Sequence, residues 1–351
     1  LKRGVFIKSL KLKHSKSKID RAGEILKRKT DTSDEVSEAL NILSDWRAYH
    51  ARPLNSFAKV LKDRTQKVSQ NAIVAQRLKR TPSILLKLSN HKTMRLSTMQ
   101  DIGGLRAILD SSEEVYSLLE LYRRSRSKHS LFSLNDYIQK PKEDGYRSIH
   151  LVYKLKKDPS IFLEIQLRSQ LQHIWATGVE VFGTLKNSSF KSGHGNKRWL
   201  NFFSLLSSIF ALKEGAPILK KHQAMGQIKL IDSTQKAMNQ LKVIENLSAY
   251  TTVYNIVSQN TAPSRKGSYS LILLNSRENT VSFNTYSASQ LEFAVEAYLN
   301  LEKKHLNDNQ MNVVLVNTGD VKRLEESYPN YFMDTKTLVR NLSLIMVNKF
   351  I

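Results

Sequence analysis

The amino-acid sequence predicts an α+β fold in which a mixed sheet is flanked by helices. Apolar residues recur at helical spacing through most of residues 18–74. Short apolar runs of strand length then appear at residues 105–109, 151–155 and 161–167, separated by helical stretches. A long helical stretch, residues 220–258, precedes further strands. These three observations together indicate two α+β parts joined by helix.

The first part begins with helices. Residues 18–48 fit two of them, and Ser33 and Asp34 suit the start of the second. We expect Pro53 to interrupt the chain before a further helix at residues 54–74. Four more helices are predicted between and after the strands, at residues 83–88, 113–124, 170–182 and 197–213.

The C-terminal part has the element order ββαβαα and is expected to be a small independent domain. Residues 261–267, rich in Pro, Ser and Gly, are the best linker in the chain. The predicted strands are residues 268–274, 280–286 and 311–316, and the predicted helices are residues 289–304, 319–326 and 335–346. The chain is therefore divided into residues 1–215, a helical connector at 216–262, and residues 263–351.

Charge is the strongest signal in the composition. Among 351 residues, 55 Lys and Arg against 31 Asp and Glu give a formal net charge of +24, which favours a polyanionic partner such as nucleic acid. The chain has no cysteine, which excludes disulfides and Cys-ligated zinc. No apolar run is long enough to span a membrane, so a cytoplasmic protein is the simplest expectation.

Two segments have the chemistry of a phosphate and metal site. Around the start of the helix at residues 83–88, a set of polar and cationic residues would suit a triphosphate: Arg77, Lys79, Ser83 and Lys87. Asp101 precedes two glycines and a strand that carries Arg106, an arrangement that can hold Mg²⁺ close to the backbone. Taken alone, the first segment could be a basic amphipathic helix, and the second could be a glycine turn before a strand.

Two further segments suit an acceptor nucleotide. The loop containing Lys142 presents Tyr146 beside Arg147 and His150, and an exposed ring next to cations is a platform for a base. Alternation along the next strand places Glu164, Gln166 and Arg168 on one face, which suits a metal ligand or general base beside a nucleobase contact. A plain surface turn is the alternative for the loop.

Together, these four segments resemble the synthetase domain of RelA/SpoT-homology enzymes, a nucleotidyltransferase-like fold, over roughly residues 25–215. The resemblance implies transfer of pyrophosphate from ATP to a nucleotide 3′-hydroxyl, with Mg²⁺ as the metal. It implies the following roles: ATP binding by Arg77, Lys79, Ser83 and Lys87; metal binding by Asp101 and Glu164, the latter also the base; phosphate and nucleotide placement by Arg106 and Gln166; and acceptor binding by Lys142, Tyr146, Arg147, His150, Arg168 and His173.

The sequence departs from the family in three places. It contains no His-Asp dipeptide, so the hydrolase activity of long members is not expected. Asp144 stands where many alarmone synthetases have Asn, and Ile-Trp-Ala-Thr follows His173. These departures leave the identity of the acceptor open.

The C-terminal part resembles that of CapRel, fused toxin–antitoxin members of the same family. There a zinc-finger-like tail without metal folds onto the ATP site through a YxxY motif, and a phage capsid protein releases it. The resemblance assigns this inhibition to Tyr328 and Tyr331, although two tyrosines packing within their own domain is the alternative. It also implies that the acceptor is the 3′-terminal adenosine of the tRNA CCA end. Expected tRNA contacts are Lys27, Arg28, Lys29, Arg123, Arg124 and Arg126.

Two other functions stay open on the sequence. A (p)ppGpp synthetase acting on GDP or GTP would use the same catalytic residues. A non-catalytic RNA- or nucleotide-binding sensor is less consistent with the sequence, because Asp101 and Glu164 are both present.

Overall fold

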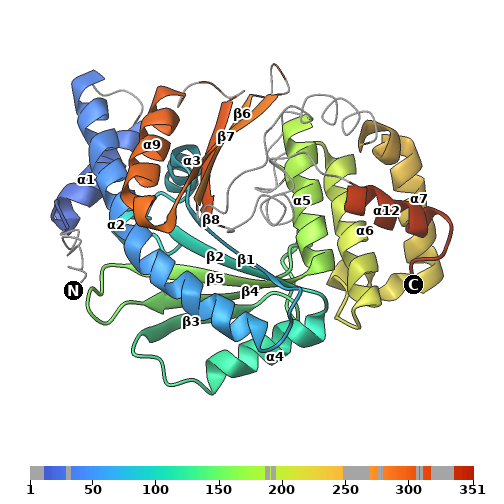
Figure 1. Cartoon of the computed structure of the whole chain (residues 1–351). Coiled ribbons are helices and arrows are strands. Elements are labelled where there is room, and N and C mark those ends of the chain that lie inside the picture. The colour runs from blue at the N-terminus through green and yellow to red at the C-terminus, as the bar shows by residue number, and fades with distance from the viewer. Residues whose placement is uncertain are drawn as a thin grey trace.

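The computed structural model describes residues 12–28, 33–185, 195–247, 269–275, 280–305, 311–317 and 336–351, with Phe190, Glu278 and Asp308. Within these residues, eight strands form one sheet of order β3-β4-β5-β2-β1-β8-β6-β7 (Figure 1). Only the central pair β2 and β5 is parallel, so the predicted mixed sheet is confirmed. The strands are β1 (Ile73–Leu78), β2 (Gly103–Leu109), β3 (Ser130–Asp136), β4 (Ile149–Lys154), β5 (Phe162–Ser169), β6 (Tyr269–Asn275), β7 (Thr280–Tyr286) and β8 (Met311–Asn317).

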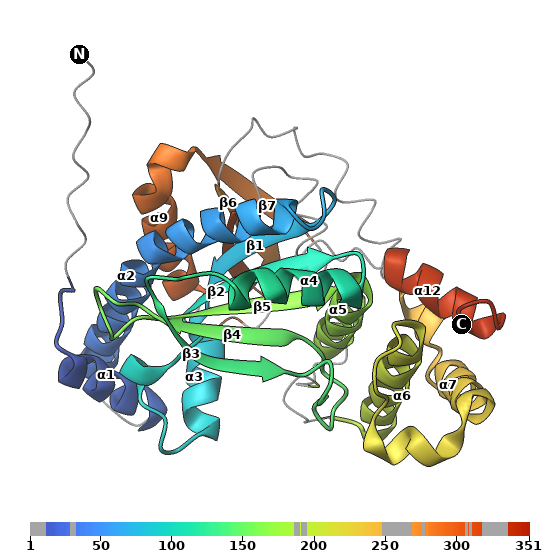
Figure 2. The same ribbon diagram turned by 90° about the horizontal axis from the view of Figure 1, so that it is seen from below.

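Helices cover the two faces of this sheet differently. Three lie along one face and share its core: α2 (Ser33–Gln66), α4 (Ser112–Arg123) and α9 (Leu291–Lys304) (Figures 1 and 2). On the opposite face, α3 (Thr81–Asn90) and α5 (Gln170–Leu185) stand apart from each other. The α1 helix (Lys16–Arg28) packs with α2, α3 and the 3₁₀ turn η1 (Leu96–Thr98) in a separate core. This arrangement leaves the middle of the second face accessible between α3 and α5.

A second helical core adjoins α5. It contains α6 (Lys197–Lys213), α7 (Gln227–Leu241) and α12 (Lys336–Met346). Two further 3₁₀ turns are η3 (Lys220–Met225) and η4 (Ala288–Gln290). In the described part of the chain, we find no helix with both the length and the apolar character needed to cross a bilayer.

The structure corrects the predicted helix boundaries near the N-terminus. Pro53 lies inside α2 and does not interrupt it, because the apolar side chains of Trp46, Leu54 and Leu61 are buried on both sides of the proline. Their burial offsets the one backbone hydrogen bond that proline cannot make. The helix expected at residues 54–74 ends at Gln66, and its last two residues begin β1.

The connector is also different from the prediction. A long connecting helix or a helix pair was expected at residues 220–258. The structure has η3, then α7, then helix again at residues 243–247, with breaks at Gly226 (φ +70°) and Lys242 (φ 48°), conformations that do not continue a helix. The exposed edge strand β3 was not predicted at all. Residues 248–258, 261–267 and 319–326 lie outside the described residues.

The C-terminal strands form no independent domain in the structure. The predicted hairpin is present as β6 and β7, but β8 pairs antiparallel with β1, so the three strands extend the main sheet. Tyr269, Leu271, Tyr298 and Leu315 are buried in the same core as α2 and α4. The expectation of independence was therefore wrong, since β8 pairs with the edge of β1 that would otherwise be exposed.

Candidate active site

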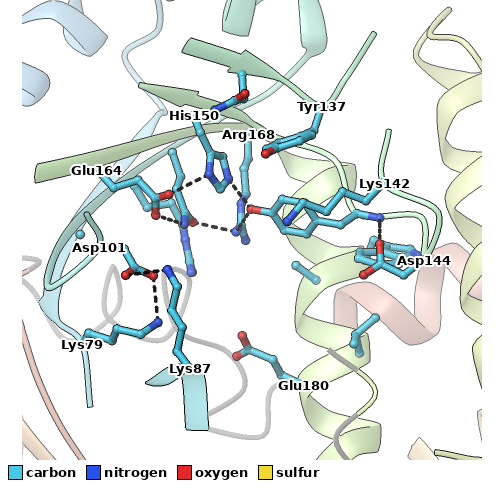
Figure 3. Close-up of a pocket in the computed structure, with 18 of the residues that line it drawn as sticks. Lys79, Lys87, Asp101, Tyr137, Lys142, Asp144, His150, Glu164, Arg168 and Glu180 are labelled. Atoms are coloured by element: carbon cyan, nitrogen blue, oxygen red, sulfur yellow. Dashed lines mark hydrogen bonds and ion pairs between the residues drawn. The ribbon is translucent and has the colours of Figure 1, made fainter. Parts of the chain in front are cut away.

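A cavity of about 380 Å³ opens on the sheet face between α3 and α5 (Figure 3). Its position follows from the layers, because α2, α4 and α9 cover only the other face. Eleven of the predicted site residues line it: Arg77, Lys79, Lys87, Asp101, Arg106, Lys142, Tyr146, His150, Glu164, Gln166 and Arg168. The fold therefore brings all four predicted segments to one place.

The register of the sheet explains how the strand residues meet. Glu164 on β5 lies beside Gly104 on β2, and Gln166 lies between Arg106 on β2 and His150 on β4. Alternate side chains of β5 point to the same face, so the predicted alignment of its polar residues is confirmed. The missing side chain at Gly104 keeps the space beside Glu164 clear.

Asp101 lies at the cavity side nearest α3 and contacts two lysines. Its Oδ2 accepts from Lys79 Nζ at 2.9 Å and its Oδ1 from Lys87 Nζ at 3.0 Å (Figure 3). Burial opposes ionisation of the carboxyl, but the two ammonium groups outweigh it and lower the pKa of Asp101. Burial in turn lowers the pKa of Lys79, partly offset by Asp101. The site thus holds an anionic ligand and two cations that phosphate oxygens can compete for.

On the opposite side, five side chains form a closed ring of hydrogen bonds. His150 Nδ1 lies 2.8 Å from Glu164 Oε1, and His150 Nε2 lies 2.8 Å from the Tyr146 hydroxyl. Gln166 Nε2 donates to Glu164 Oε2 at 2.7 Å, and Arg168 Nη2 donates to both Gln166 Oε1 and the Tyr146 hydroxyl at 2.7 Å. Each member is therefore oriented by two others, which fixes Glu164 relative to Tyr146.

This ring shifts the pKa values of its members. Burial would raise the pKa of Glu164, but the hydrogen bond and charge of His150, with Gln166, lower it to about 2. Burial opposes the positive form of His150, yet Tyr146 and Glu164 raise its pKa. Tyr146 is also buried, and Arg168 and His150 nevertheless lower its pKa to about 7. Glu164 is consequently an anion across the neutral range, as a cation ligand must be.

Aromatic side chains line the part of the cavity next to these five hydrogen-bonded residues. The centroid of Tyr146 lies 6.1 Å from that of Tyr137 and 6.4 Å from that of Trp175. Lys142 Nζ lies 4.9 Å from the Tyr137 centroid and 5.1 Å from the Tyr146 centroid. The predicted placement of the Tyr146 ring beside cations is confirmed, with Lys142 and Arg168 near its face, but the ring is half-buried and not exposed as expected.

Arg147 does not line the cavity, although it was expected to bind the acceptor. Its side chain is buried, with Nε donating to Ser207 Oγ at 3.1 Å and Nη1 donating to the Ile138 carbonyl at 3.0 Å. Burial lowers the pKa of Arg147 to about 10. Gly145, with φ +99°, turns the loop so that Arg147 points inward. Arg147 therefore anchors the loop against α6.

Two other predicted ligands also lie outside the cavity lining. His173 is buried in α5, and Ser83 is half-buried in the first turn of α3. Neither residue is among those that line the cavity, to which α3 contributes Lys87 and α5 contributes Trp175, Ala176, Val179 and Glu180.

The predicted tRNA contacts are dispersed. Lys27 is only 12% exposed, and its Nζ contacts Glu24 at 2.6 Å and the Met94 carbonyl at 2.8 Å, so it ties α1 to a neighbouring loop. Arg28 is exposed, and Lys29 lies outside the described residues. Arg123 pairs with Glu120 at 2.7 Å, at the end of a helix on the other sheet face. Arg124 and Arg126 are exposed at that same end.

Several lining residues were missed as ligands by the sequence reasoning. They are Gln100, Asn135, Tyr137, Asp144, Trp175, Val179 and Glu180. Figure 3 shows Glu180 pointing from α5 toward the side of the cavity that holds Lys87. The helical spacing of 176, 179 and 180 could have identified this face, whereas Asn135 lies on a strand that was not predicted.

The residues present fit a magnesium ion shared with substrate. No group of three or more His, Asp or Glu side chains suited to a metal is found among the described residues. Mg²⁺ commonly uses one or two protein carboxylates, with water and substrate phosphates completing its shell. Asp101 and Glu164 would supply those two carboxylates, and their negative charges interact across the cavity.

Most of the residues that line this cavity lie in a stretch of the chain that resembles known proteins. Residues 76–189 match the region found in RelA / SpoT proteins. The stretch begins in β1 and ends beyond α5, and it contains every predicted site residue between Arg77 and His173.

Individual relatives agree with that match. The chain is 36% identical over 112 residues to the GTP pyrophosphokinase YjbM of Bacillus subtilis, covering 30% of this chain and 52% of the relative. It is 33% identical over 126 residues to a probable chloroplast GTP diphosphokinase of Arabidopsis thaliana, covering 34% and 16% respectively. The chain therefore spans about half or less of these relatives.

Among solved structures, the small alarmone synthetase 1 of Bacillus subtilis, bound to its product pppGpp, aligns with a TM-score of 0.40 and 25% sequence identity. This alignment covers 47% of the chain and 88% of that structure.

Proposed function

We propose that this chain is a Mg²⁺-dependent pyrophosphokinase that uses ATP as donor. The observation that carries the proposal is the division of one cavity into two sides. Asp101, Lys79 and Lys87 form a side suited to phosphates and metal, and Tyr146 with Tyr137 forms a side suited to a base. Glu164 lies where the two sides meet (Figure 3). The names of the relatives, GTP pyrophosphokinase and GTP diphosphokinase, support the same reaction.

In this reaction the acceptor 3′-hydroxyl oxygen attacks the β-phosphorus of ATP. The bond from that phosphorus to the oxygen bridging the α-phosphate breaks, AMP leaves, and the pyrophosphate group becomes attached to the acceptor. Lys79, Lys87 and Arg106 neutralise the phosphate charge, and Tyr146 orients the acceptor base. Bound Mg²⁺ would supply further charge neutralisation at the phosphates. Glu164 accepts the hydroxyl proton as the bond forms, held in place by His150.

The direct test is to supply ATP labelled at its γ-phosphate together with Mg²⁺, bulk tRNA, GDP and GTP. Pyrophosphate transfer puts the label on an acceptor and releases AMP in equal amount. Release of ADP instead would show transfer of a single phosphate and would contradict the proposal. Glu164→Gln, which keeps the side-chain shape, is the matched inactive control.

We further propose that the acceptor is the 3′-terminal adenosine of tRNA, so that transfer blocks translation. The formal net charge of +24 supports a polyanion much larger than a nucleotide. The competing acceptors are GDP and GTP, which the names of the relatives favour. Label on tRNA that falls steeply with added salt supports the first acceptor, while label on GDP or GTP makes the chain a (p)ppGpp synthetase.

Inhibition by the C-terminal part, through Tyr328 and Tyr331, belongs to the same proposal, with a phage capsid protein as the releasing partner. Both tyrosines lie outside the described residues, and the support for this role is the resemblance stated above. The test is expression of Tyr328→Ala with Tyr331→Ala in a host cell, which should be toxic without phage. Adding Glu164→Gln should abolish that toxicity. A folded, abundant double variant that leaves growth unchanged counts against the inhibition.

A further inference from the structure

The first residue of α3 is held by a buried charge network that includes a helix from the far end of the chain. Arg47 on α2 is 0% exposed. Its Nη1 donates to the Glu302 carboxylate and, at 2.8 Å, to Thr81 Oγ1. Its Nη2 donates to the Tyr298 hydroxyl at 2.6 Å. Thr81 begins α3, and Glu302 and Tyr298 both belong to α9, so three helices meet at this network.

Glu302 also acts as a cap for α3. Its Oε1 accepts from the Thr81 backbone N–H at 2.9 Å, and its Oε2 accepts from Thr81 Oγ1 at 2.8 Å. The cap position of α3 is Arg80, whose side chain makes no capping hydrogen bond. The first N–H groups of a helix need an external acceptor, and a carboxylate also interacts favourably with the helix dipole. A residue more than two hundred positions away in the sequence therefore satisfies the N-terminus of α3.

The α3 helix in turn carries a cation of the phosphate side. Lys87 reaches Asp101 from α3, and Lys79 reaches it from the residue pair immediately before the helix. A tilt of α3 would displace Lys87, since the helix is only ten residues long and is held at its start by Glu302. The same C-terminal part also places β8 against β1 beside Arg77.

We propose that Glu302 is a positioning residue for the nucleotide site: through Thr81 it fixes α3, and through α3 it sets Lys87 against the donor phosphates. Its effect on ATP rests on the function proposed above. The C-terminal part is then a structural component of that site, and its removal would open the sheet at β1 and leave Arg47 without its carboxylate partner.

The test compares three variants of the full chain. Glu302→Gln keeps the side-chain size and one acceptor but removes the charge. Glu296→Gln makes the same change at an exposed position of the same helix. Leu118→Ala removes a fully buried side chain from α4 and destabilises the protein away from α3. Amide hydrogen exchange over residues 81–90 is measured together with KM for ATP, KM for the acceptor and kcat.

We expect Glu302→Gln alone to accelerate exchange in α3 and to raise KM for ATP about tenfold, with KM for the acceptor and kcat changed by less than about threefold. Unchanged exchange in α3 overturns the capping role. Faster exchange with an unchanged KM for ATP overturns the positioning of Lys87. If the unaltered chain transfers no pyrophosphate, the proposed function fails, while the exchange measurement still decides whether Glu302 holds α3.

Discussion

The hydroxyl of Ser207 on α6 donates a hydrogen bond of 2.6 Å to the carbonyl oxygen of Gly145, in the loop that carries Tyr146. Arg147 donates to the same hydroxyl at 3.1 Å. The loop that presents Tyr146 is therefore fixed from behind by a helix that contributes to a different core.

Gly145→Ala tests this attachment. Gly145 has φ +99°, and a Cβ there would lie 2.7 Å from the Ser207 Cβ and 3.2 Å from Trp175 Cζ2. We expect a loss of unfolding free energy of about 2–4 kcal/mol and weaker acceptor binding, with ATP binding retained. The control is Gly215→Ala, where φ is +63° but no atom lies within 4 Å of the added Cβ, and about 1 kcal/mol is expected. Equal losses in the two variants would show that the contact with Ser207 is unimportant.

The ionisation of Tyr146 can be followed directly. Its phenol has a pKa lowered to about 7, because Arg168 and His150 outweigh the effect of burial. We expect one tyrosine of the native protein to titrate near neutral pH in an ultraviolet absorbance titration, far below the usual value of about 10. Tyr146→Phe should remove this step and leave the titration at higher pH in place. If no tyrosine of the native protein ionises below pH 9, Arg168 and His150 do not lower the pKa of Tyr146 as expected.

His50 should make the protein sensitive to mild acid. It is fully buried beneath Trp46, and burial lowers its pKa to about 4, while the unfolded chain binds the proton near 6.5. The contribution of His50 to the free energy of unfolding is therefore fully present above pH 6.5. It is lost as the pH falls toward 4, by about 3 kcal/mol in total. Denaturant unfolding at several pH values should show this loss.

His50→Asn is the matched variant, because its amide nitrogen can replace Nδ1 in the hydrogen bond to the Trp46 carbonyl, which His50 makes at 2.8 Å. Its stability should vary less over the same pH range. If the unfolding free energy of the variant and of the unaltered chain changes equally with pH, other groups cause the acid sensitivity.

Asp101→Asn should strongly impair transfer at every Mg²⁺ concentration. The substitution removes a proposed metal ligand and the partner of both Lys79 and Lys87. We expect a decrease of kcat of about a hundredfold or more. Asp110→Asn, an exposed carboxylate just beyond the other end of β2, should be neutral. Full activity of Asp101→Asn at saturating Mg²⁺ would exclude Asp101 as a ligand.

Local sequence patterns were sufficient to predict most of the residues that line the site. Glu164, Gln166 and Arg168 alternate along one strand, and alternation alone places them on one face. The Tyr146 ring was predicted from a turn with cations beside it. Arg147 was misassigned because neighbours in a loop can point in opposite directions, and only the positive φ of Gly145 with the partner at Ser207 decides which one is buried.

Distant contacts explain what the sequence reasoning missed. Helical spacing from Val295 and Tyr298 places Glu302 on the buried face of α9, but nothing in the local sequence identifies Arg47 as its partner. The first two residues of β1 were assigned to the preceding helix because they continue its apolar pattern, and only pairing on both edges makes β1 a central strand. Pattern rules carry no information about partners that far along the chain.

The pairing of β1 with β8 has a consequence for synthesis on the ribosome. Gln76 pairs with Asn317, so one neighbour of β1 emerges from the ribosome more than two hundred residues after β1 itself. Until then the nascent chain has an open strand edge and no Glu302 beside Arg47. A nascent chain that has not yet reached residues 302–317 therefore lacks both β8 and Glu302, so the cavity reaches its final geometry only after this segment has emerged.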